Sequence, residues 1–207
     1  AKAFLTLAGI HHVARRGWEA DDLIAALWQN VRRDHPEAQI RILSADKDLL
    51  QLVDSHTEQV RPVSSGPTDR WDVARVSEKY GVPPAYLATA MALIGDTSDN
   101  IPGVHGIGPV KAAKMLTENG YLLERALAER PEDLEVARMS FALINLRTFT
   151  YAEEGLMLPD LPPFGPTSFA GVLSMPLIRY LDRYLLESVK TRLAARSLWH
   201  QPVLIGD

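Results

Sequence analysis

Apolar positions in the first third of the chain switch between a helical and a strand-like period. Residues 18–34 predict a helix because four apolar side chains recur there at helical spacing: Leu23, Ile24, Leu27 and Val31. Residues 40–43 (IRIL) predict a short strand, residues 47–53 a short helix, and the alternating residues 57–63 a second strand. This order of elements is typical of an α/β domain with a partly parallel sheet.

Beyond Trp71 the apolar positions recur only at helical spacing. Asp72 is a suitable N-cap and Gly81 a suitable C-terminal residue for a helix between them, and the prolines at 83 and 84 open a helix that reaches Ile94. Other predicted segments are helices at 111–119, 131–146 and 177–195, a turn at 64–67 and an extended connector at 156–166. The pattern therefore divides the chain into an α/β part, residues 1–70, and a helical part, residues 71–207.

The composition is that of an ordinary globular protein. Of the 207 residues, 46% are hydrophobic and 23% are charged, which excludes fibrous repeats and intrinsic disorder. No apolar run approaches the ~20 residues that a membrane span needs, and no signal segment opens the sequence, so no membrane partner is expected. The absence of cysteine excludes disulfides, thiolate zinc sites and a cysteine nucleophile, and it fits a cytoplasmic protein.

The charge balance becomes informative once the acidic residues are sorted by position. The formal net charge of −4 comes from 22 basic and 26 acidic residues, and by itself it argues weakly against a nucleic-acid partner. Seven of the acids, however, fall into three short motifs. Without these seven the balance is 22 basic against 19 acidic residues, or +3, so the rest of the surface is mildly basic.

Each of the three acidic motifs lies at the end of a predicted element. Residues 19–22 begin a helix, residues 44–48 follow the first strand, and residues 95–100 form a loop between two helices. Taken singly, each motif has an ordinary explanation: favourable charge at a helix N-terminus, an N-cap, or capping within a loop. The candidate metal-ligating and catalytic side chains in these motifs are Glu19, Asp21, Asp22, Asp46, Asp48, Asp96 and Asp99.

Taken together, the acidic motifs predict a divalent metal site. Carboxylates that converge in one cleft repel one another and raise each other's pKa unless a cation neutralises them. Because the candidate ligands offer only oxygen atoms, the expected ion is Mg²⁺ or Mn²⁺. Two such ions ~4 Å apart would stabilise an in-line displacement at phosphorus.

The segment from Ile101 to Lys114 predicts a hairpin that binds phosphate. Gly106 and Gly108 let a phosphate approach the backbone closely, and Pro109 at the first helical position is followed by the free N–H groups of a helix N-terminus. Lys111 and Lys114 add positive charge. The pattern matches a helix-hairpin-helix over about residues 95–119, which binds duplex DNA through its backbone without reading bases. A tight turn with small packing residues is the alternative.

Four stretches of the sequence, taken in order, resemble the 5′ nuclease family. This family comprises the 5′→3′ exonuclease domain of bacterial DNA polymerase I, stand-alone bacterial and phage 5′-3′ exonucleases, and flap endonucleases. The stretches are residues 17–22 (GWEADD), 45–53 (ADKDLLQLV), 95–104 (GDTSDNIPGV) and 106–108 (GIG). The resemblance implies a PIN-like nuclease core with a partly parallel sheet, followed by a helical helix-hairpin-helix region.

The resemblance also implies an activity and roles for the matching residues. The expected protein is a structure-selective, metal-dependent nuclease that cleaves flap or nicked duplex DNA in replication and repair, with metal-activated water attacking the phosphodiester. One metal ion would be surrounded by Glu19, Asp21 and Asp22. The second ion would be held by Asp46, Asp48, Asp96 and Asp99. A K⁺ ion that bridges the hairpin and a DNA phosphate would be held by the backbone carbonyls of Gly103, Val104 and Ile107.

The family pattern includes parts expected to precede Ala1: two strands that carry aspartates, and a helical arch that receives the 5′ end. Residues 1–70 are therefore expected to be the C-terminal portion of the metal-binding core. A protein starting at Ala1 is expected to bind branched DNA but to cleave it poorly. Arg15 and Arg16 are either contacts for a 5′ phosphate near the arch or solvated charges. The alternative function is a non-catalytic duplex-binding module that keeps the hairpin without a complete metal site.

Overall fold

The computed structural model describes residues 2–7, 12–63 and 68–151, together with Arg179 and Arg183. The predicted turn at 64–67 and the predicted connector at 156–166 lie outside these described residues. The predicted terminal helix also lies outside them, except for Arg179 and Arg183, whose backbone is helical.

The chain divides into two compact units. One unit is formed by residues 1–16 and 159–207 and contains helix α1, Lys2–Leu7. The other is formed by residues 17–158 and contains the helices and strands named below. The predicted boundary at residue 70 lies inside this second unit and stays a prediction.

Helix α2, Ala20–Asp34, forms because its apolar side chains fall on one face. Leu23 is buried on this face, as is Trp28, whose indole N–H donates a 3.0 Å hydrogen bond to the hydroxyl of Thr57. The helix begins two residues after its predicted start because Glu19 is the N-cap, with extended backbone at φ −86° and ψ 174°. Its end at Asp34 matches the prediction.

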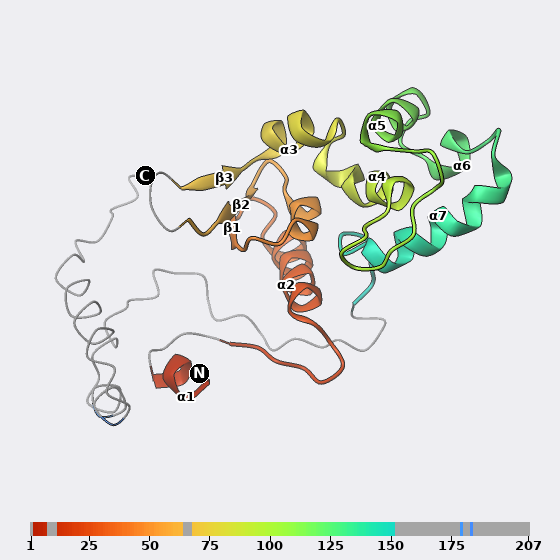
Figure 1. Ribbon diagram of the computed structural model, residues 1–207. Coiled ribbons are helices and arrows are strands. Elements are labelled where there is room, and N and C mark those ends of the chain that lie inside the picture. Colours follow the sequence, from red (N-terminus) through yellow and green to blue (C-terminus); the bar gives the residue numbers. More distant parts are fainter. Residues whose placement is uncertain (1, 8–11, 64–67, 152–178, 180–182, 184–207) are drawn as a thin grey trace. The chain divides into compact units, whose positions relative to one another are not determined.

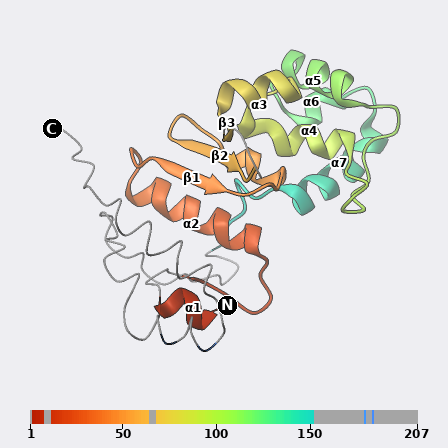
Figure 2. The same ribbon diagram turned by 60° about the vertical axis from the view of Figure 1, so that its left-hand side comes forward.

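The sheet has three strands in the order β1-β2-β3: Ile40–Leu43, Thr57–Arg61 and Asp69–Trp71. Strands β1 and β2 are parallel, while β2 and β3 are antiparallel, so the predicted partly parallel sheet is confirmed. A 3₁₀ helix, η1 at Asp48–Leu52, connects β1 to β2. Figures 1 and 2 show α2 running alongside this sheet. The sequence did not predict strand β3.

The helical part begins with α3, Val73–Tyr80, whose bounds match the prediction. The Asp72 carboxylate accepts a 2.9 Å hydrogen bond from the Arg75 N–H, and Gly81 ends the helix in the left-handed conformation. The following helices are η2 (Pro84–Tyr86), α4 (Leu87–Ile94), α5 (Pro109–Glu118), α6 (Leu123–Ala126) and α7 (Pro131–Ile144). Helix α6 was not predicted. Within the described part of the chain, no helix is long and apolar enough to cross a membrane.

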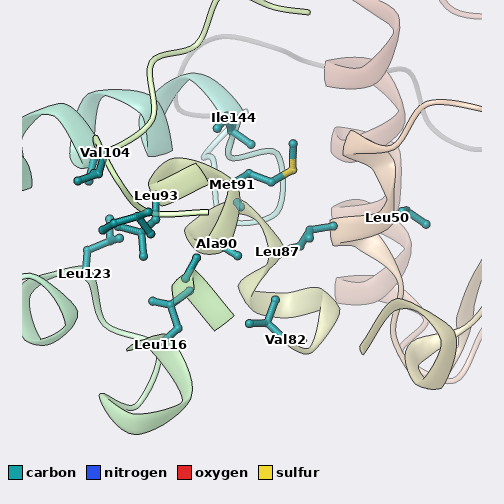
Figure 3. Packing of buried hydrophobic residues seen from close by; sticks show 14 of the residues in the cluster. Leu50, Val82, Leu87, Ala90, Met91, Leu93, Val104, Leu116, Leu123 and Ile144 are labelled. Atoms are coloured by element: carbon teal, nitrogen blue, oxygen red, sulfur yellow. The ribbon is translucent and has the colours of Figure 1, made fainter. Parts of the chain in front are cut away.

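Helix α4 lies in the middle of the hydrophobic core. Every side chain from Leu87 to Leu93 is buried, and the helix packs against α5, α7 and both 3₁₀ helices. Figure 3 shows Leu87 directed towards Leu50, and Leu93 on the side of Val104 and Leu123. This packing fixes the position of the α4 C-terminus, where the acidic loop begins.

Candidate metal centre and adjoining hairpin

Three of the predicted carboxylates converge. Asp48, Asp96 and Asp99 each offer one oxygen atom, and these atoms all lie within 4.8 Å of one another. Asp48 begins η1 in the connection between β1 and β2, whereas Asp96 and Asp99 lie in the loop that follows α4. Asp96 is buried, Asp48 is half-buried and Asp99 is exposed. We refer to these three residues as the candidate metal centre.

Asp96 is the most firmly held of the three. Its Oδ1 accepts hydrogen bonds from the Ser98 N–H (3.0 Å) and the Ser98 hydroxyl (2.5 Å), and its Oδ2 forms an ion pair with the Lys47 ammonium. Burial by itself would raise the pKa of Asp96. The hydrogen bonds from Lys47 and Ser98 outweigh burial and lower this pKa to about 2, so the carboxylate is ionised at neutral pH.

Asp48 carries the oxygen that lacks a partner. Its Oδ1 is buried and accepts no hydrogen bond. Burial, reinforced by repulsion from Asp46, raises the pKa of Asp48 to about 6. A buried carboxylate oxygen without a partner, next to two further carboxylates, is a fit for a hard divalent cation. The residues present therefore suit the predicted ion, which would supply the missing partner for Oδ1.

This pKa gives a prediction for the metal-free protein. Below pH 3.8 Asp48 is protonated in both the folded and the unfolded chain. Between pH 3.8 and about 6 the folded chain binds this proton more tightly than the unfolded chain does, so the free energy of unfolding falls as the pH rises through this range. The Asp48→Asn variant should therefore melt several degrees higher than the wild type in EDTA at pH 8. The two proteins should converge towards pH 4, as followed by thermal unfolding.

The control for this prediction is Asp72→Asn. Asp72 caps α3 away from the candidate metal centre, and asparagine caps a helix equally well. This variant should follow the wild type at every pH. Equal melting temperatures for wild type and Asp48→Asn at pH 8 would contradict the raised pKa.

The other predicted ligands make local hydrogen bonds. Asp46 Oδ1 accepts from the Asp48 N–H at 3.0 Å, Asp22 Oδ2 from the Glu19 N–H at 3.0 Å, and Asp21 Oδ1 from the Asp22 N–H at 2.9 Å. Within the part of the chain described here, these four acids are not in the group of converging carboxylates. Local capping of the kind left open by the sequence applies to Asp46, and also to Asp96, whose Oδ1 accepts from the Ser98 N–H. The metal roles of all four acids stay predictions.

The acidic loop is closed by backbone contacts. Asp96 and Ile101 exchange two N–H···O hydrogen bonds of 3.0 and 2.8 Å. Gly95 and Gly103 then lie backbone against backbone, because a Cβ on Gly103 would be 2.6 Å from the Gly95 nitrogen and closer still to the Ile94 carbonyl. Only glycine fits at residue 103. This contact joins the metal-centre loop to the segment that follows it.

The hairpin, residues 103–109, has one buried and one open side. Val104 and Ile107 are buried, and the Val104 N–H donates a 2.8 Å hydrogen bond to the Leu93 carbonyl. A Cβ on Gly106 or Gly108 would meet no atom within 4 Å, and Gly106 has φ +74°. The open side thus leaves backbone accessible directly before the N-terminus of α5, as a phosphate contact requires.

The predicted basic residues differ in their surroundings. Lys111 Nζ donates to the Gly106 carbonyl at 3.3 Å, which holds its charge over the hairpin. Lys114 pairs with Glu118 at 3.8 Å, one helical turn further on. Arg15 and Arg16 are exposed and belong to the other unit of the chain, so their predicted role stays a prediction.

A cavity of about 830 Å³ adjoins both features. Its lining includes Lys47 and Asp96, Gly103 and Pro109 of the hairpin, and Lys79 and Tyr80 of α3. Of the predicted K⁺ ligands, the Val104 carbonyl also accepts a 3.1 Å hydrogen bond from Ile107. The role of these carbonyls stays a prediction.

Sequence reasoning missed two residues of this site, Lys47 and Ser98. Both contact Asp96, and Lys47 Nζ also lies 3.2 Å from the Ser98 hydroxyl. A serine two residues after an aspartate is a signal for such a turn. The position of Lys47 between two acids was the only signal for its ion pair.

The fold and the site define a class of protein in which a carboxylate cluster beside a mixed sheet adjoins a glycine-containing hairpin at the N-terminus of a helix. Two family models match the chain in succession: the 5′-3′ exonuclease N-terminal resolvase-like domain over residues 1–81, and the 5′-3′ exonuclease C-terminal SAM fold over residues 82–149. The chain belongs to the 5′-3′ exonuclease family, as the sequence motifs predicted.

Relatives in this family differ in length. DNA polymerase I of Rhizobium leguminosarum is 38% identical over 187 residues, which cover 85% of this chain and 18% of that protein. The 5′-3′ exonuclease of Aquifex aeolicus is 35% identical over 175 residues, which cover 77% of this chain and 58% of that protein. The chain thus spans less than two thirds of either relative.

The fold class is confirmed by solved structures. T5 5′-exonuclease with bound zinc ions superimposes with a TM-score of 0.63 at 20% identity, over 89% of this chain and 65% of that one. The match supports the two-part architecture of a resolvase-like core and a helical region.

Proposed function

We propose that this chain belongs to a structure-selective 5′→3′ exonuclease or flap endonuclease that hydrolyses DNA phosphodiesters in replication and repair. The observation that carries the proposal is the cavity of about 830 Å³ lined both by Asp96 of the candidate metal centre and by Gly103 and Pro109 of the hairpin. A DNA strand held by the hairpin would pass directly beside the metal centre.

The cofactor in this proposal is Mg²⁺ or Mn²⁺, because the candidate ligands are carboxylate oxygens only. When bound, divalent ions activate water and stabilise the leaving oxygen of an in-line displacement. Asp48, Asp96 and Asp99 would hold one ion, with Asp46 beside them. Glu19, Asp21 and Asp22 would serve a second ion. K⁺ at the carbonyls of the hairpin completes the set of proposed ions.

The names of the relatives support DNA as the substrate. The Aquifex relative is a 5′-3′ exonuclease, and the T5 D15 flap endonuclease was solved in a pseudo-enzyme-product complex with DNA and metal ions. Both statements concern those proteins. For this chain they support a nuclease that acts in the cytoplasm of a bacterial or phage-infected cell.

The direct test is cleavage of a 5′-labelled flap duplex by the full-length protein, since the part that starts at Ala1 is expected to cleave poorly. The expected result is Mg²⁺-dependent release of the 5′ strand near the single-strand junction, and no release in EDTA. An unbranched duplex and a nicked duplex, run in parallel, separate flap cleavage from exonuclease activity. Binding of all three substrates without cleavage in Mg²⁺ or Mn²⁺ would contradict the proposal.

That last outcome is what the alternative function, a non-catalytic duplex-binding module, would produce. Such a module has no need for converging acids, yet a buried carboxylate oxygen without a partner lies among three carboxylates. Holding these charges together costs stability unless a cation neutralises them. The geometry therefore favours the enzyme.

The hairpin gives a second prediction for DNA. Because it offers backbone N–H groups and Lys111 to phosphates, duplex binding should be insensitive to base sequence and should weaken steeply with salt. Lys111→Ala should weaken binding to unrelated duplexes about equally and reduce the salt slope by about 1. Fluorescence anisotropy over a range of KCl concentrations measures both.

The matched comparison is Lys114→Ala. Its ammonium pairs with Glu118, so its removal should have the smaller effect on affinity. A changed preference among duplex sequences in Lys111→Ala would contradict backbone recognition.

A further inference from the structure

Lys47 occupies the one oxygen of Asp96 that a metal ion could use. Both hydrogen bonds from Ser98 go to Asp96 Oδ1. Asp96 Oδ2 is buried, accepts no hydrogen bond from any other group, and faces the Lys47 ammonium. A divalent ion that binds Asp48, Asp96 and Asp99 together would therefore need the place that Lys47 Nζ takes.

The ion pair is asymmetric in its exposure. The Asp96 side chain is 6% exposed, whereas that of Lys47 is 39% exposed. Asp96 is fixed by the loop and by Ser98, whereas Lys47 has a flexible stem and is among the residues that line the cavity of about 830 Å³. The lysine is thus the partner that can leave, and the cavity gives it room to do so.

From this geometry we propose that Lys47 is an internal counter-ion of the metal centre. Its ammonium neutralises Asp96 when no metal is bound, and it moves from Asp96 into the cavity when a divalent ion takes its place. The inference rests on the proposed metal centre and adds a role for a residue that is not a ligand.

Two consequences follow for the protein. The ammonium competes with the divalent ion, so Lys47 weakens metal binding while it stabilises the metal-free fold. Once displaced, the same ammonium lies in the cavity that Gly103 and Pro109 also line. There its charge faces the path of a phosphate held by the hairpin, so metal occupancy and substrate attraction are coupled.

The first experiment compares Mn²⁺ binding by calorimetry in the wild type and in Lys47→Met. Removing the competing charge should tighten Mn²⁺ binding about tenfold, and it should lower the melting temperature in EDTA because Asp96 is left buried and unpaired. Lys79→Met is the control, because Lys79 lines the same cavity and should leave Mn²⁺ affinity unchanged. If Lys47→Met does not fold in EDTA, Lys47→Gln keeps a hydrogen-bond donor to Asp96 without the charge.

The second experiment follows the lysine itself. An amine-reactive ester should modify Lys47 several-fold faster after Mn²⁺ is added, while Lys79 reacts at the same rate with and without the metal, as read by peptide mass spectrometry. This readout would not move if Lys47 had a merely structural role.

The outcomes separate the inference from the proposed function. If the wild type binds no Mn²⁺, the metal centre itself fails. If the wild type binds Mn²⁺ but the Lys47 variant binds it equally or more weakly, or if Lys47 reacts no faster with metal present, the counter-ion role is overturned and the metal centre stands.

Discussion

Asp96→Asn should slow cleavage of a flap duplex by more than about 100-fold, because changes to residues that merely support a metal ligand already cost 10–100-fold. Asp96 is the buried member of the candidate metal centre and is ionised at neutral pH, so the substitution removes a full negative charge next to the ion. Asparagine has nearly the same shape, and the Ser98 hydrogen bonds to Oδ1 can persist.

DNA binding should separate from cleavage in this variant. The hairpin is unchanged and the site loses a negative charge, so duplex affinity measured in EDTA should not fall. Asp72→Asn, at the N-cap of α3, is the control that should cleave at the wild-type rate. A cleavage rate for Asp96→Asn within a few-fold of the wild type would show that Asp96 holds no metal ion.

Gly103→Ala should destabilise the fold by about 3 kcal/mol or more, at or above the upper end of the usual cost of overpacking. The added methyl would lie 2.6 Å from the Gly95 nitrogen, and the colliding atoms are backbone atoms that cannot rotate away. Because Gly95 immediately precedes Asp96, any backbone shift that relieves the collision also displaces the metal centre. Urea unfolding measures the loss.

Gly108→Ala is the matched substitution in the same segment. Its methyl would meet no atom within 4 Å and its φ of −92° suits alanine, so stability should stay close to that of the wild type. Its methyl does project from the open side of the hairpin, so duplex affinity should fall. Similar unfolding free energies for the two variants would contradict the close backbone contact between residues 95 and 103.

The elements that the sequence predicted well are those with local signals. Helix α3 has its predicted bounds because Asp72 caps its start and Gly81 ends it. Strand β1 has its predicted bounds because three of its four residues, Ile40, Ile42 and Leu43, are apolar. Both signals lie within a few residues of the element that they define, so they can be recognised in the sequence without knowledge of the rest of the fold.

Strand β3 lacked such a signal. It has three residues and exists through its pairing with β2 and through Trp71, whose ring lies 4.2 Å from the Arg61 guanidinium and 4.3 Å from that of Arg75. Helix α6 is similarly short, with Leu123 buried in the core. Contacts between distant residues form these elements, so their own sequence does not reveal them.

The sequence predicted which types of residue form the candidate site better than it predicted the contacts that these residues make. The convergence of Asp48, Asp96 and Asp99 follows the predicted second group of ligands. The ammonium beside Asp96 was not foreseen. An Asp-x-Asp spacing predicts that two carboxylates are close. Which of them accepts a hydrogen bond from a nearby backbone N–H depends on the backbone conformation after the strand. Lys47 becomes recognisable only when the loop after α4 is brought beside it.

The hydrogen bond from the Val104 N–H to the Leu93 carbonyl ties the hairpin to the last turn of a helix that is almost wholly buried. The conformation of the hairpin therefore depends on α4. As an isolated peptide or grafted onto another protein, residues 95–119 would lose the packing against α4 that keeps Val104 and Ile107 buried. The hairpin conformation that exposes the glycine backbone would then be lost as well. A transfer of the proposed DNA contact to another protein would have to include α4.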